Sequence, residues 1–298
     1  MFLKLRLIKD RVLSGVFLLA ALLILFLVVG LGLGLYYKSS PIMEKNSFWG
    51  LVLSSEWKPF KEAFGLLSYV SGTVGVVLVA IVLALPFSLL TSIYLSEYAN
   101  KWVKKIIIPI IDMLSGIPPV IYGVWGVLVI VPFVQENLSL HFVEFSSGYS
   151  LLAGGIVLAV MTFPMIVSIL LEVFNTVPQE LRDASLSMGA THWQTVKFVL
   201  LKKAGPGIIA ATVLGVSRAL GETIAVLMVC GNVPQIPQSL FDPCYPLSAL
   251  IANNYGEILS QPMYESALML SAFLLFAIIF IFNASSRLVL IRLEKKMG

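Results

Sequence analysis

Six long apolar segments dominate the sequence and set its predicted architecture. Each is long enough to cross a bilayer, because a spanning helix needs about 20 apolar residues. Several are longer than this, which predicts tilted or extended helices. The pattern predicts an all-α membrane protein with six transmembrane helices. The segments run from about Ser14 to Tyr37, Leu67 to Ser96, Ile106 to Val134, Tyr149 to Phe174, Ala204 to Gly231 and Glu265 to Leu290.

The third segment departs from a regular helical pattern because it is dense in proline and glycine, which break or bend helices. Irregular backbone is tolerated in a membrane only where protein or a cavity satisfies the freed backbone groups. We therefore expect a bent or locally unwound element, in which Asp112 caps a half-helix or pairs with Lys104 or Lys105. The helix-breaking residues are Pro109, Gly116, Pro118, Pro119, Gly123 and Gly126.

The fifth segment carries two charges within an apolar run. Arg218 and Glu222 stand four residues apart between Ile208 and Val229. An arginine at the centre of a membrane helix costs about 3 kcal/mol on insertion scales and usually faces protein or a watery pathway. On a continuous helix the two charges share a face with small residues that permit close helix packing. We expect them either to line a transport route or to form a self-neutralising i,i+4 salt bridge. The small residues are Gly207, Ala211, Gly215 and Ala219.

Composition and charge distribution agree with a membrane protein. Hydrophobic residues make up 58% of the 298 and charged residues 12%, values far from those of soluble globular domains. Fifteen lysines and arginines lie before the first segment or within 101–105, 182–203 and 287–296, whereas four lie in the loop after the first segment. The positive-inside rule therefore predicts that both termini are cytoplasmic. The sequence contains no basic patch interleaved with aromatic residues, so it does not indicate nucleic-acid binding.

The beginning of the chain resembles a signal peptide only in part. Four basic residues precede the first apolar segment, but no clear small-residue cleavage site follows it. We therefore interpret residues 1–66 as a retained anchor helix with an extracytoplasmic loop, and residues 67–298 as the main membrane domain.

The sequence of the loop 175–203, which we call the hook, predicts two short capped helices. Two threonine-x-x-glutamine capping boxes open them, and Gly189 between them suits the left-handed conformation that ends a helix. A rigid projection with an apolar ridge suits docking into a groove of a partner, although its helices could also pack only on their own bundle. The boxes are Thr176 with Gln179 and Thr191 with Gln194, and the ridge consists of Leu181, Ala184, Ser185 and Met188, with Arg182 and Asp183 to one side.

Other catalytic or metal-binding chemistry has little support. His141 and His192 each lack a second ligand nearby, so we predict no metal site. Cys230 and Cys244 could pair or stay free, and the sequence does not decide between these states. No H-E-x-x-H motif or paired carboxylates occur within a segment, and no G-x-x-x-x-G-K-[ST] motif occurs anywhere. The chain is therefore predicted to be neither an enzyme nor an ATPase, and to need no cofactor.

Two motifs resemble those of a known transporter family. In the hook, Asp183-Ala184-Ser185, then Gly189, then Val199-Leu200-Leu201 resembles the EAA loop of ABC-importer permeases. The stretch from Arg218 to Glu222 and the stretch from Gly116 to Gly126 resemble those of PstC-type permeases of phosphate importers. The similarity extends from about Leu67 to the end. Two positions depart from the family's pattern. Asp183 stands where the family usually has glutamate, and Lys202 stands where it commonly has proline.

The resemblance implies a type I ABC importer permease fold and a role in moving inorganic phosphate across a bacterial or archaeal plasma membrane. It implies four kinds of partner, namely a second homologous permease of PstA type, two ATPase subunits of PstB type, an extracytoplasmic phosphate-binding protein of PstS type and the lipid bilayer. Arg218 and Glu222 are the expected translocation residues. The residues expected to couple the chain to the ATPases are Leu181, Asp183, Ala184, Gly189 and Met188.

Three alternatives stay open. A permease for another oxyanion, such as sulfate or molybdate, would share the hook and the arginine. A secondary transporter would need no ATPase, although no inverted repeat is detectable between the halves of the chain. A membrane-embedded enzyme would need a catalytic constellation that the segments lack.

Overall fold

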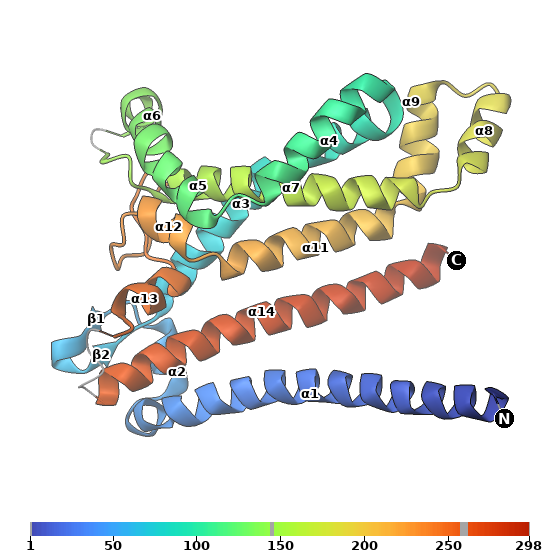
Figure 1. Cartoon of the computed structure of the whole chain (residues 1–298). Coiled ribbons are helices and arrows are strands. Elements are labelled where there is room, and N and C mark those ends of the chain that lie inside the picture. Colours follow the sequence, from blue (N-terminus) through green and yellow to red (C-terminus); the bar gives the residue numbers. More distant parts are fainter. Residues whose placement is uncertain (1, 144–145, 257–261, 298) are drawn as a thin grey trace.

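The computed structural model describes residues 2–143, 146–256 and 262–297. Figure 1 shows α1, α14, α11 and α7 running in much the same direction, one above another, with α3 crossing them obliquely. The bounds of these helices are α1 Phe2–Lys45, α3 Leu67–Ile93, α7 Leu151–Asn175, α11 Gly205–Gly221 and α14 Pro262–Met297.

Shorter elements connect the long helices. A small cap between α1 and α3 consists of α2 and a two-stranded antiparallel hairpin, and α4, α5 and α6 lie between α3 and α7. Several helices continue through π-helical turns, including one over Tyr94–Tyr98 directly after α3. The bounds are α2 Phe48–Leu53, β1 Trp57–Lys58, β2 Ala63–Phe64, α4 Lys101–Ser115, α5 Pro119–Trp125, α6 Val131–Phe133, α8 Gln179–Ser187, α9 His192–Thr195, α10 Leu201–Lys203, α12 Ile224–Val229 and α13 Leu247–Asn254.

The described residues contain five helices that are long and apolar enough to span a membrane, and a bent pair supplies a sixth candidate. The number therefore agrees with the predicted six when the bent pair counts as one span. The five are Val12–Lys45, Leu67–Tyr98, Pro119–Leu138, Leu151–Asn175 and Pro262–Arg292, and the bent pair is His192–Lys203 with Gly205–Gly221.

The prediction of a single third span over Ile106–Val134 is wrong, whereas the predicted bend is confirmed. The helix α4 ends at Ser115, and α5 begins at Pro119. The break occurs because Pro118 precedes another proline, which disfavours helical backbone, and Pro118 is extended, with ψ of 140°. The 15 residues of α4 reach only about 22 Å, less than the roughly 30 Å apolar core of a bilayer.

In the described part of the chain, Asp112 forms no ion pair with Lys104 or Lys105. Asp112 accepts a hydrogen bond from Ser168 of α7 (3.5 Å). Lys104 donates to the backbone carbonyl of Ser96 (2.9 Å). Both contacts join α4 to neighbouring helices.

Buried side chains form a central core, an outer core and a small third cluster of Leu95, Ile111 and Val167. The central core joins α3, α7, α11 and α12 through residues such as Val76, Leu158 and Val226. In the outer core, Trp57 of the hairpin packs edge-on against Tyr69 and Tyr264. This outer core contains residues from both sides of position 66, so the N-terminal loop packs tightly on the rest of the chain.

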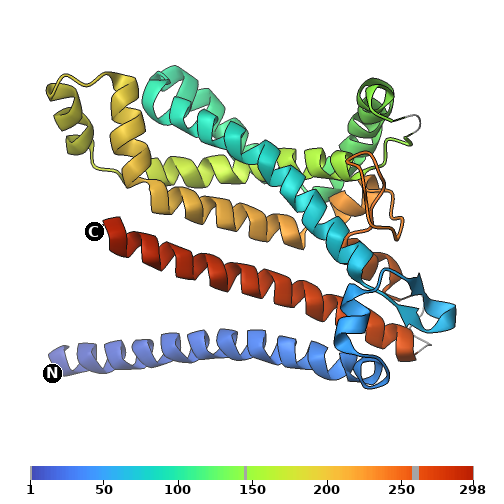
Figure 2. The same ribbon diagram turned by 180° about the vertical axis from the view of Figure 1, so that it is seen from behind.

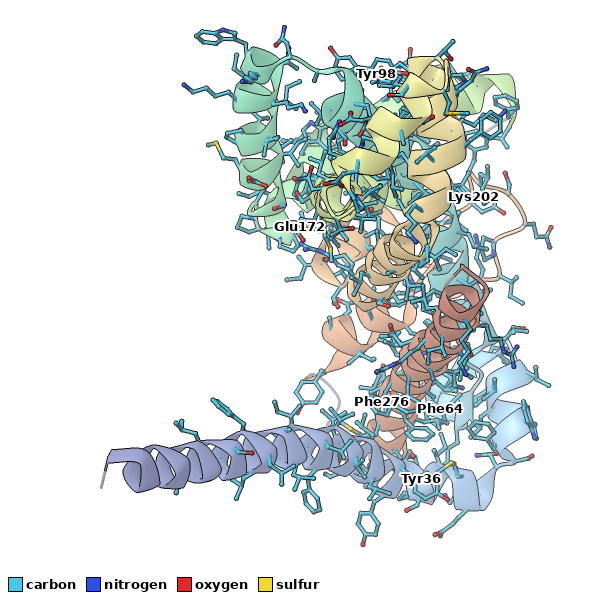
Figure 3. The ribbon with its side chains drawn as sticks, turned by 90° about the vertical axis from the view of Figure 1, so that its right-hand side faces the viewer. Tyr36, Phe64, Tyr98, Glu172, Lys202 and Phe276 are labelled. Carbon is cyan, nitrogen blue, oxygen red and sulfur yellow. The ribbon has the colours of Figure 1, made fainter. Side chains whose placement is uncertain are left out.

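The helix α1 stands at the edge of the bundle. Its side chains from Val12 to Gly30 are exposed, as expected for a helix surrounded by lipid. It contacts α14 near its outer end, where Tyr36 packs against Phe273 (ring centroids 5.8 Å apart) and Lys38 bonds to Glu265 (2.9 Å). Tyr36 is labelled at this junction in Figure 3.

The two ends of the bundle differ in charge. Figures 1 and 2 show both chain termini at the same end as α8 and α9, with the hairpin and α2 at the opposite end. The end with the termini therefore carries the basic segments 182–203 and 287–296. This arrangement is the one that the positive-inside prediction requires.

The small-residue stripe of α11 packs on α7, as predicted. Ala211, Gly215 and Ala219 are buried, and a methyl group on Gly207 would overlap Cγ1 of Val173 in α7. The glycines therefore permit a close approach of the two helices.

We expect Gly207→Ala to destabilise the protein by about 1–3 kcal/mol, because the added methyl overpacks this contact. The thermal unfolding midpoint in detergent measures the effect. Gly205→Ala is the matched control, since no neighbouring atom lies within 4 Å of its added methyl. Adding Val173→Ala to Gly207→Ala should restore part of the loss. Equal midpoints for the two single variants would contradict the close approach.

Candidate functional site

The predicted fifth span is interrupted at Glu222. The helix α11 ends at Gly221, Glu222 is extended (φ −70°, ψ 133°), and α12 begins at Ile224. The expectation of a continuous helix carrying Arg218 and Glu222 on one face is therefore wrong. Glycine is a poor residue for a helix interior.

The carboxylate of Glu222 stabilises the start of α12. Its Oε1 accepts a hydrogen bond from the backbone N–H of Ala225 (3.3 Å). The backbone carbonyl of Glu222 accepts a second bond, from the hydroxyl of Ser248 in α13 (2.7 Å). Glu222 therefore caps one helix and fastens the break to another. An acidic residue is favourable at this position, because the N-terminus of a helix carries partial positive charge.

Arg218 lies in the last turn of α11, next to this break, and is half-buried. Its Nη1 donates to the thioether sulfur of Met165 in α7 (3.6 Å). Among the described residues no ion pair joins Arg218 to Glu222, so this structure lacks the i,i+4 salt bridge that was the alternative to a transport role.

The guanidinium of Arg218 retains donors for another group. It carries five N–H donors, whereas a thioether is a weak acceptor. None of its nitrogen atoms is among the buried, unpartnered side-chain atoms of the described residues. Its N–H groups other than the donor to Met165 are therefore not buried without a partner. The role of Arg218 as an anion contact stays a prediction, and Glu222 makes structural contacts to α12 and α13.

The hook consists of two short helices, as predicted. Gly189 has φ +84°, which confirms the left-handed conformation, and its N–H donates to the carbonyl of Leu186 (2.9 Å). The second capping box is also confirmed, because Thr191 and Gln194 bond reciprocally at 3.3 and 2.8 Å.

The first predicted capping box, Thr176 with Gln179, is wrong. The helix α7 continues to Asn175, so Thr176 follows its last turn, and its hydroxyl donates to the carbonyl of Val173 (2.7 Å). The helix α8 begins after Pro178, and no side chain caps its first turn. The apolar run of span 4 therefore extends the helix into the sequence that resembles a cap.

The exposed ridge of the hook differs in part from the predicted one. Leu181 and Met188 are exposed, as expected, and Ala184 lies on the surface with them. Ser185 instead faces α9, where its hydroxyl lies 2.9 Å from that of Thr195. Asp183 is exposed and accepts a bond from Gln179 (3.2 Å). Three further apolar residues of the hook are exposed although they lie outside the predicted ridge, namely Leu186, Trp193 and Phe198.

The hook joins the fifth span through a sharp bend. The axes of His192–Lys203 and Gly205–Gly221 differ by 68° across Ala204. Lys202, labelled in Figure 3, stands before this bend, so the chain turns without the proline common at that position. Pro206 in the first turn of α11 provides a helix start instead.

The structure shows both cysteines as buried free thiols. The two residues lie close together, and the backbone N–H of Cys244 donates to the carbonyl of Cys230 (2.9 Å).

Arg182, to which the sequence assigned no role, is a further functional candidate. Its side chain is buried at the base of the hook and bonds to Glu97 (3.1 Å) in the turn that follows α3. The only signal in the sequence was that Arg182 and Glu97 are charged residues that flank apolar spans at the basic end of the bundle. Because the two residues lie 85 positions apart, their pairing produces no local sequence pattern.

Comparisons with known proteins agree with one another. The sequence model for binding-protein-dependent transport system inner membrane components matches residues 84–297. The chain is 37% identical to the phosphate transport system permease protein PstC of Xylella fastidiosa (strain 9a5c) over 82% of this chain and 79% of that one. It is 34% identical to a probable phosphate transport system permease protein PstC of Methanocaldococcus jannaschii, covering 89% of both.

Solved structures share the fold at low sequence identity. A bacterial alginate ABC transporter chain superposes with a TM-score of 0.63 at 14% identity, covering 93% of each chain. A chain of the MetNI methionine ABC transporter, in an inward-facing conformation, gives a TM-score of 0.56 at 22% identity. That match covers 77% of this chain and 94% of the other.

Proposed function

The chain belongs to the family of binding-protein-dependent transport system inner membrane components, and we propose that it is the permease subunit of an ATP-driven importer for inorganic phosphate. It is a multi-pass inner membrane protein with the fold of type I importer permeases. The relatives named as phosphate permeases support phosphate as the substrate.

The observation that carries this proposal is the position of Arg218. Its guanidinium is half-buried beside the break between α11 and α12, and none of its nitrogen atoms is both buried and without a hydrogen-bond partner. Arginine matches phosphate oxygens in a bidentate geometry and keeps its charge at all physiological pH values. A route through a membrane must also release what it binds, and a single half-buried arginine suits brief contact.

Glu222 serves this route indirectly in our proposal. Its carboxylate caps α12 and its carbonyl bonds to Ser248, so it holds the broken span open next to Arg218. Its negative charge near the route also tempers anion affinity.

The hook is the proposed contact for the ATPase subunits. Its two helices present Leu181, Met188 and Ala184 on the outside, and the Gly189 turn sets the angle between them. The chain contains no nucleotide-binding lysine motif, so we assign ATP hydrolysis to two partner subunits. A second permease and an extracytoplasmic phosphate-binding protein complete the proposed assembly, with both chain termini and the hook in the cytoplasm.

Uptake of radiolabelled phosphate tests the substrate. We expect phosphate-starved cells that express the complete transporter to accumulate the label, and unlabelled phosphate to suppress this uptake. Sulfate and molybdate in large excess should not suppress it, because the named relatives transport phosphate. Suppression by sulfate or molybdate would favour the other-oxyanion alternative. Purification of this chain from the same cells should also recover an ATPase subunit.

A further inference from the structure

The base of the hook contains a buried ion pair. The guanidinium of Arg182 bonds to the side chain of Glu97 (3.1 Å) and to the backbone carbonyls of Val177 (2.6 Å) and Phe174 (2.9 Å). Only 11% of the Arg182 side chain and 7% of the Glu97 side chain are exposed. Arg182 therefore joins three separate parts of the chain, namely α8, the end of α7 and the turn after α3.

The turn after α3 contacts both helices of the hook. Glu97 holds α8 through Arg182, and the backbone carbonyl of Glu97 lies 3.2 Å from Nε2 of His192 in α9. The ring of His192 also packs edge-on against Tyr98, with centroids 4.9 Å apart. Figure 3 labels Tyr98 beside the helices of the hook. The π-helical turn over Tyr94–Tyr98 thus contacts one residue in each helix of the hook.

Apolar and polar groups both occur at this junction, where Val177 and Val196 of the hook belong to the central core. A polar cavity of about 550 Å³ lies at the base of the hook, and Glu97, Arg182, His192 and Lys104 line it. The Arg182–Glu97 bond joins α8 itself directly to the turn after α3. A surface ion pair would contribute little, but these two charges are buried, and the loss of either leaves its partner uncompensated.

We propose that the Arg182–Glu97 pair is the rigid joint that fixes the hook to α3 and α7, so that a push on α8 moves these helices as a unit. This inference rests on the proposed role of the hook in ATPase coupling. Arg182 acts as a positioning residue in this mechanism, since it sets the angle of α8 and touches no substrate. Without the joint, α8 would pivot on its connections at 176–178 and 189–191. Movement of the ATPase would then tilt α8 without moving α3 and α7.

Coupling in proteoliposomes tests the joint. The complete transporter is reconstituted, and the phosphate transported per ATP hydrolysed is measured for Arg182→Gln, Glu97→Ala and the double variant. We expect a several-fold lower ratio in each single variant and no further loss in the double variant, because both changes remove the same contact. Glu172→Gln is the matched control, since Glu172 is an exposed carboxylate of α7 at the same end of the bundle.

A distance measurement separates rigidity from transport. Spin labels on Ser187 of α8 and Lys101 of α4 report the angle of the hook, and the two native cysteines are buried. We expect a broader distance distribution in Arg182→Gln and Glu97→Ala than in the parent. This result does not depend on phosphate being the substrate, so it stands even if the proposed function fails.

Specific outcomes would overturn the proposal. An unchanged distance distribution, or a normal transport ratio in Glu97→Ala, would exclude the joint. Glu97→Ala is the decisive variant, because it leaves the two carbonyl bonds of Arg182 in place. Failure of Glu97→Ala to insert in the membrane would assign the pair to folding instead. Loss of ATPase binding by an inserted variant would support the proposal.

Discussion

Phosphate uptake is expected to fall to background when Arg218 is replaced by glutamine. Glutamine keeps hydrogen-bonding capacity but removes the positive charge and the forked set of donors that phosphate oxygens match. Only Met165, through its weakly accepting sulfur, bonds to Arg218 among the described residues, so the substitution disturbs little of the fold. Membrane insertion and assembly with the partner subunits should stay normal. Uptake of radiolabelled phosphate, with immunoblots of the purified complex, measures both.

Two further variants make the Arg218 experiment decisive. Arg287→Gln applies the same chemical change to an exposed residue of α14 and should leave uptake unchanged. The double variant Arg218→Gln with Glu222→Gln distinguishes the two interpretations of this pair. A self-neutralising salt bridge predicts recovery when both charges are removed, whereas an anion contact predicts continued loss. Normal uptake by Arg218→Gln alone would return Arg218 to a structural role.

Replacement of Gly189 by valine is expected to uncouple the hook from the ATPases. The left-handed backbone at this position (φ +84°) costs a residue with a Cβ roughly 1–2 kcal/mol, and more for a β-branched side chain. No neighbouring atom lies within 4 Å of the added Cβ, so the penalty comes from backbone conformation and not from a clash. We expect weaker copurification with the ATPase or ATP hydrolysis without matching transport.

The matched control for Gly189→Val is Gly189→Asn. Asparagine tolerates the left-handed conformation far better than valine, and the open space around Gly189 accommodates its side chain. The asparagine variant should therefore retain most coupling. Equal behaviour of the two variants, or unchanged coupling in both, would count against the Gly189 turn as the element that sets the angle of the hook.

Much of this architecture is readable from local pattern. The spans, the left-handed Gly189 and the Thr191–Gln194 box each depend on residues within one helix turn or one bilayer length. Apolar length and capping chemistry act over these short distances, so the sequence predicts them directly. The same local rules were wrong at Thr176, where the preceding apolar helix extends through the apparent cap.

The interruptions within spans were harder to predict. A glycine and a glutamate inside an apolar run are compatible with a continuous helix, and a tertiary contact decides the outcome. The carbonyl of Glu222 bonds to Ser248, which lies 26 positions later. This contact stabilises an extended residue that hydropathy alone assigns to a helix.

Span number, helical class, the basic end of the bundle and the hook follow from the sequence alone, because each expresses local hydrophobicity, charge or capping. The separation of Arg218 from Glu222 and the burial of Arg182 against Glu97 follow from three-dimensional packing. The physical reason is that these features depend on which distant groups meet. A buried charge is stable only with a partner, and the chain brings that partner from 85 positions away.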